Sequence, residues 1–120
     1  MPGATAAVPT PSQLVQSIDA GDLNIALDIY PGRAGPNDLG VFLTDLDGDE
    51  KPVQNVIVRY KYLDKDLGEN EDFAEAFHPP THYTLNTSQL SLAGDWEIQI
   101  IVRREGLLDA KATFTVQVQA

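Results

Sequence analysis

The sequence predicts an all-β fold, a sandwich of two antiparallel sheets built from seven or eight strands. Apolar and polar residues alternate with a period of two in five segments, as expected for strands with one buried face. Turn-forming pairs such as Asp47-Gly48 and Glu105-Gly106 separate these segments at intervals of about 8–12 residues. The one helix-compatible stretch, residues 70–76, is too short to be stable as a helix by itself.

The strands differ in the clarity of their alternation. The clearest are residues 23–30, 39–45, 55–62, 96–103 and 112–119. Weaker patterns predict strands at residues 14–18, 73–77 and 83–85. The inward positions of the clear strands predict one core, which consists of Leu23, Ile25, Leu27, Ile29, Leu39, Val41, Leu43, Val56, Val58, Trp96, Ile98, Ile100, Phe114, Val116 and Val118.

The length of 120 residues predicts a single domain. Residues 1–12 contain three prolines and no apolar periodicity, so we expect a flexible Pro-rich linker there, followed by one β-sandwich domain over residues 13–120. This first stretch has neither a basic segment nor an apolar one, so it is not an intact signal peptide.

The charge of the chain is strongly negative, with 18 acidic and 8 basic residues and a net charge of −10. Such a surface repels phosphate backbones and anionic lipid, which argues against nucleic-acid binding and against direct lipid binding. It suits cations, basic partners, or solubility alone. The chain has no cysteine, which excludes disulfides, thiolate metal sites and a cysteine nucleophile.

The two histidines of the chain, His78 and His82, flank the segment Pro79-Pro80-Thr81. Two imidazoles four residues apart can share a Cu(II) or Zn(II) ion, with Glu75, Asp72 or a water completing the shell. The prolines exclude the helical geometry in which such residues usually converge. The alternative is a surface loop whose histidines bind nothing.

The acidic run of residues 45–50 superficially resembles a calcium loop. An EF-hand requires glycine at position six and glutamate at position twelve, whereas here Gly48 is at position four and Val56 at position twelve. We therefore expect a polar hairpin turn. No nucleophile elbow or phosphate-binding loop is present, so the sequence predicts no enzyme activity.

Two segments together resemble a known family. These are the loop Pro31-Gly32-Arg33-Ala34-Gly35-Pro36-Asn37 and the corner Ala93-Gly94-Asp95-Trp96, accompanied by the strand of residues 39–45 and the hairpin Arg103-Arg104-Glu105-Gly106. Over residues 21–118 the chain resembles the YtkA-like (FixH-like) domains, as found at the C-terminus of CopD-type copper-transport proteins. The resemblance implies an immunoglobulin-like sandwich located outside the cytoplasm, in the periplasm or at the cell surface, in a membrane-anchored protein.

The resemblance also implies a function, a non-catalytic accessory or docking domain associated with copper transport or resistance. The expected partner is a membrane-transport protein or adjoining membrane helices, and the expected metal contact is weak, through His78 and His82. The methionine-rich Cu(I) loop of the family is missing, because Met1 is the one methionine. The alternative is a structural or protein-interaction sandwich with no metal role. No cofactor other than copper is implied.

Overall fold

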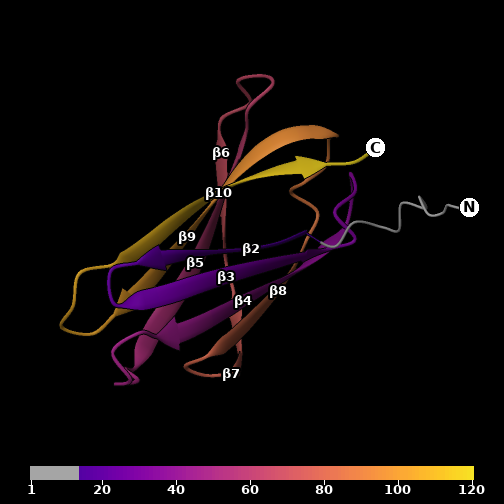
Figure 1. The fold of residues 1–120 in the computed structure, drawn as a ribbon. Coiled ribbons are helices and arrows are strands. Elements are labelled where there is room, and N and C mark those ends of the chain that lie inside the picture. The colour runs from indigo at the N-terminus through magenta and orange to yellow at the C-terminus, as the bar shows by residue number, and fades with distance from the viewer. Residues whose placement is uncertain (1–13) are drawn as a thin grey trace, which may run out of the picture.

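The computed structural model describes residues 14–120, which form nine strands in two antiparallel sheets (Figure 1). In chain order the strands are β2 (Leu14–Ala20), β3 (Leu23–Tyr30), β4 (Asn37–Asp45), β5 (Val53–Tyr62), β6 (Glu69–Phe73), β7 (Glu75–His78), β8 (His82–Thr87), β9 (Gly94–Arg104) and β10 (Ala110–Val118). The predicted all-β, two-sheet class is confirmed. The predicted linker, residues 1–12, lies outside the described residues.

The strand order within the sheets is that of an immunoglobulin-like sandwich. One sheet has the order β2-β3-β4-β8-β7, and the other has the order β10-β9-β5-β6. Without the extra edge strand β2, the first sheet corresponds to strands A, B, E and D of that fold, and the second to G, F, C and C′. The chain therefore crosses between the sheets after β4, after β6 and after β8.

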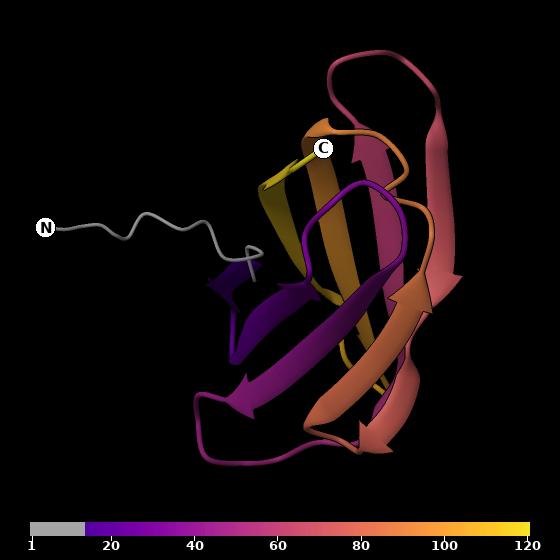
Figure 2. The ribbon, with the colours of Figure 1, turned by 90° about the vertical axis from the view of Figure 1, so that its right-hand side faces the viewer.

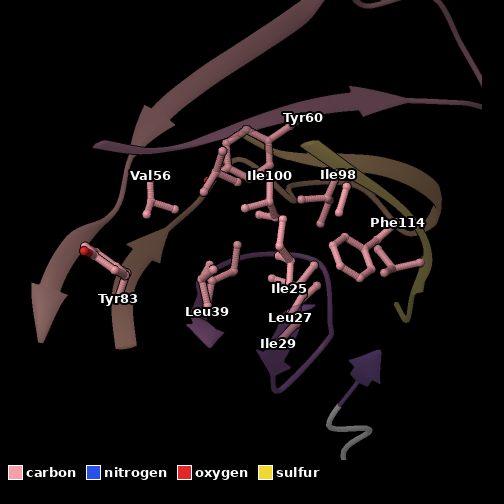
Figure 3. Packing of buried hydrophobic residues seen from close by; sticks show 14 of the residues in the cluster. Ile25, Leu27, Ile29, Leu39, Val56, Tyr60, Tyr83, Ile98, Ile100 and Phe114 are labelled. Carbon is pink, nitrogen blue, oxygen red and sulfur yellow. The ribbon is translucent and has the colours of Figure 1, made fainter. Parts of the chain in front are cut away.

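The core lies between the sheets and is built from the inward positions of both (Figure 3). Every residue of the predicted core is buried, which confirms the period-two reading of the clear strands. The core also includes residues that were not predicted to lie there, among them Tyr60, Tyr83 and the loop residue Leu90, which is fully buried.

The segment around residue 74 differs from the prediction of one strand over residues 73–77. The chain forms β6 in the four-stranded sheet, leaves it at Ala74, and forms β7 in the five-stranded sheet (Figure 2). The backbone N–H of Ala74 still donates to the carbonyl of Val56 at 2.9 Å. This switch between sheets raises the number of strands from the predicted seven or eight to nine.

Two isoleucines of the four-stranded sheet point outward and are nevertheless buried. Ile57 and Ile101 pair directly and are each 4% exposed. The same row across the sheet continues with Phe73 on β6 and Lys111 on β10, and both of these side chains are long enough to cover their neighbours. Within residues 14–120 no helix is long and apolar enough to cross a membrane.

Candidate functional site

The loop between β3 and β4 is organised by one buried amide. The side-chain oxygen of Asn37 accepts from the N–H of Gly32 at 2.7 Å, and its Nδ2 donates to the carbonyls of Arg33 and Gly35 at 2.8 and 3.0 Å. Asn37 is 1% exposed, so it satisfies backbone groups that would otherwise be buried without a partner. The first segment that carries the family resemblance therefore has a structural role.

The corner at Trp96 is likewise part of the core. The indole Nε1 donates to the carbonyl of Leu92 at 2.9 Å, and the ring packs against Tyr62 with centroids 4.9 Å apart. Gly94 has a φ of 133°, and a Cβ there would collide with the carboxylate of Asp64 and lie 2.8 Å from the Tyr62 hydroxyl. That hydroxyl donates to the carbonyl of Ala93 at 2.7 Å, so a glycine is required for the strand to begin here.

The predicted ligands His78 and His82 are brought together by the hairpin of β7 and β8. His78 ends β7, His82 begins β8, and the two residues pair directly across the strands. Their ring centroids are 6.4 Å apart and the ring planes are inclined by 39°. A register shift between Ala76 and His78 turns both imidazoles to the same face of the sheet. The sequence could not show this pairing, because it depends on the bulge.

Both imidazoles also belong to an aromatic cluster. The ring of His82 stacks on Phe42 with centroids 4.1 Å apart and an interplanar angle of 20°. Phe77 meets His78 and His82 edge to face, with centroid distances of 4.4 and 5.0 Å. These ring contacts orient the histidines whether or not they bind a metal.

The further ligands considered from the sequence do not join the histidines to form a site. Asp72 lies on β6 in the other sheet, where its carboxylate accepts from the Thr87 hydroxyl at 3.4 Å. Glu75 is one row away from the histidines, opposite Thr84. Among residues 14–120 no three His, Asp or Glu side chains are grouped closely enough to hold a metal ion. Any metal at His78 and His82 would therefore be held by two imidazoles and by water.

The acidic run of residues 45–50 is occupied by an internal cation. The ammonium of Lys51 is 2.9 Å from the Asp47 carboxylate and from the Asp49 carbonyl, 3.4 Å from Asp22, and 3.8 Å from Asp45. The hydrogen bond from Lys51 is the main cause that lowers the pKa of Asp47, and the bond to Asp47 raises the pKa of Lys51. The lysine thus fills the position that a bound cation would need.

The aromatic cluster borders a shallow depression on the outer face of the five-stranded sheet. Its floor is Gly40, in the middle of β4, and its volume is about 470 Å³. The strand register arranges the outward residues in three rows, Asp28–Gly40–Thr84–Glu75, Ala26–Phe42–His82–His78, and Tyr30–Asp38–Asn86. The depression exists because glycine contributes no side chain at the centre of this face; a Cβ at Gly40 would lie 3.1 Å from the Phe42 ring.

The phenols inside the sandwich are part of the core. Burial raises the pKa values of the Tyr60 and Tyr83 phenols. Tyr60 is 1% exposed.

Comparisons of the chain with family models, with curated proteins and with solved structures gave no significant match. The resemblance to the YtkA-like domains therefore stays a prediction from the residues quoted above.

Proposed function

We propose that this domain is a non-catalytic accessory module in copper transport or resistance, located outside the cytoplasm. In this proposal it docks on a membrane-transport protein or on adjoining membrane helices, and it contacts Cu(II) weakly through His78 and His82. The observation that carries the metal contact is the β7–β8 hairpin, in which the two imidazoles are direct cross-strand partners. Cu(II) is favoured over Zn(II) by the usual order of affinities for nitrogen ligands.

A second candidate is a protein-interaction sandwich without any metal role. It is favoured by the ring contacts of His82 with Phe42 and Phe77, which give the histidines a packing function of their own. Both candidates use the outer face of the five-stranded sheet. They differ in whether His78 and His82 bind a metal ion, so metal binding by these histidines decides between them.

Calorimetric titration with Cu(II) at neutral pH separates the two candidates. We expect the parent protein to bind and the double variant His78→Ala, His82→Ala to release no heat beyond dilution. Phe77→Ala is a comparison variant, because it removes a ring that orients both imidazoles and keeps the imidazoles themselves; it should weaken Cu(II) binding less than the double variant does. Binding should weaken in acid, since a protonated imidazole cannot act as a ligand. Equal heat from the parent and the double variant would contradict the metal contact, and so would no heat from either.

A further inference from the structure

The charged residues on the outer face of the five-stranded sheet have one sign. All charged residues in its strands are acidic, and none is Lys or Arg. Those at outward positions are Asp19, Asp28, Asp38 and Glu75, whereas Asp45 continues the inward positions of β4 and lies 3.8 Å from Lys51. In the four-stranded sheet acidic and basic residues are equally numerous, and they form pairs such as Arg59–Glu71, in which Nε and Oε1 are 2.9 Å apart. The outward charges in the strands of the five-stranded sheet are therefore all negative, whereas those in the strands of the four-stranded sheet are mixed.

Aromatic rings are exposed on this same face. Tyr30 is 50% exposed and Phe42 is 39% exposed, and both border the depression over Gly40. A cation placed over an aromatic ring is attracted by the negative potential of the ring face. Carboxylates and partly exposed aromatic rings around one depression thus favour the same kind of ligand.

We propose that this face binds a basic segment of a partner protein, with one Arg or Lys side chain inserted in the depression over Gly40. The proposal rests on the docking role proposed above and specifies the chemistry of the partner. An arginine fits best, because its guanidinium has a flat face for stacking on Phe42 and five N–H donors for carboxylates.

The carboxylate of Asp38 is already oriented for such a ligand. It accepts a 2.6 Å hydrogen bond from the Nδ2 of Asn86, which is its cross-strand partner. A carboxylate has about four acceptor positions, so this bond fixes the group and leaves acceptor positions for a guanidinium. Glu75 borders the opposite side of the depression. The net charge of −10 would additionally accelerate the approach of a basic partner and repel an acidic one.

The test is a titration of the isotope-labelled protein, followed by the chemical shifts of its backbone amides. The probes are the blocked peptide acetyl-Gly-Arg-Gly-Arg-Gly-amide, the same peptide with glutamate in place of arginine, and the neutral sugar maltopentaose. We expect saturable shifts with the arginine peptide alone, centred on β4 and on its neighbours β3 and β8. Raising the salt concentration should weaken the binding.

Three variants make the test specific to the face. Asp38→Asn and Phe42→Ala should each weaken peptide binding by about two- to fivefold. Glu105→Gln removes the same charge as Asp38→Asn, but in the β9–β10 loop of the other sheet, and should leave the affinity unchanged. His78→Ala should abolish the Cu(II) contact and keep peptide binding, so a failure of either proposal can be recognised separately.

Two results would overturn the inference. One is a scattered set of shifts together with equal weakening by Glu105→Gln and Asp38→Asn, which would mean that the peptide responds only to net charge. The other is a response of the same amides to maltopentaose and not to the arginine peptide, which would make the face a carbohydrate site. The dispersion of the amide spectrum shows for each variant that the sandwich is folded.

Discussion

Asn37 and Asp38 are neighbours in β4, and they belong to two regions that use polar side chains in opposite ways. Asn37 is buried, and all three of its hydrogen bonds go to the backbone of the loop of residues 31–37. Asp38 is on the outer face, where its bond from Asn86 leaves the carboxylate exposed to solvent. The most recognisable segments of this chain therefore stabilise the fold, while the groups that we propose to bind a partner lie on the outward positions of an ordinary strand.

The corner residue Trp96 provides the largest expected effect on stability. Trp96→Ala removes a ring that is 4% exposed, packs on Tyr62 and donates a hydrogen bond to the Leu92 carbonyl. We expect a loss of about 3–5 kcal/mol in the free energy of unfolding, out of the roughly 5–15 kcal/mol typical of such a domain. Denaturant unfolding followed by circular dichroism measures it. An unchanged midpoint would mean that this corner is not part of the core.

The amide of Asn37 provides the next effect. Asn37→Ala leaves the N–H of Gly32 and two carbonyls without their partner, which should cost about 2–3 kcal/mol. The matched control is Asn86→Ala, because that amide is exposed and should contribute no more than about 0.5 kcal/mol. Equal losses of stability in both variants would contradict the view that the buried amide of the loop stabilises the fold and the exposed amide of the outer face does not.

Acid should destabilise the end of the sandwich at the β2–β3 turn, which is opposite to the loop of residues 31–37. The guanidinium of Arg104 donates two hydrogen bonds to Asp22, at 3.1 and 3.2 Å, and these are the main cause that lowers the pKa of Asp22. A lowered pKa in the folded state means that the stabilisation is present above the ordinary value of about 3.9 and is lost as the pH falls below it.

Unfolding midpoints between about pH 5 and pH 2 measure this effect. We expect the parent to lose stability over that range and Asp22→Asn to lose less, since it has no charge to neutralise. At neutral pH this variant should be destabilised less than Asn37→Ala, because asparagine still offers an oxygen to Arg104. Parallel curves for the parent and for Asp22→Asn would show that the pair with Arg104 does not set the acid limit.

The outer face should give the smallest effect on stability. Phe42→Ala removes a ring that is 39% exposed and contacts His82, so we expect a loss below about 1 kcal/mol. Together with weakened peptide binding, this result would separate the binding surface from the core. A loss of stability as large as that of Trp96→Ala would instead mean that Phe42 is part of the core.

The sequence was sufficient for the fold class and for the faces of the clear strands, because a period of two leaves one choice of inward residues. It could not assign strands to sheets, which is why the switch at Ala74 was missed. Ile57 and Ile101 were not predicted to be buried, since alternation does not show that Phe73 and Lys111 lie beside them in neighbouring strands.

The site was less predictable, because it depends on register across strands that are distant in sequence. The sequence identified His78 and His82, yet Phe42, Asp38 and Gly40 come close to them only through the pairing of β4 with β8. The acidic run of residues 45–50 contains one further signal. The spacing of Asp47 and Lys51 predicts an ion pair across the turn, and that pair explains why the acidic run is filled by the protein itself.

The most direct test of the whole account is a map of amide line broadening by substoichiometric Cu(II), because this paramagnetic ion broadens only the signals near its binding site. We expect the strongest broadening in the β7–β8 hairpin and at Phe42, which stacks on His82, and none in the loop of residues 31–37. Broadening centred on the Lys51 cluster of Asp22, Asp45 and Asp47, or spread evenly over the acidic residues, would contradict the assignment of function to the outer face.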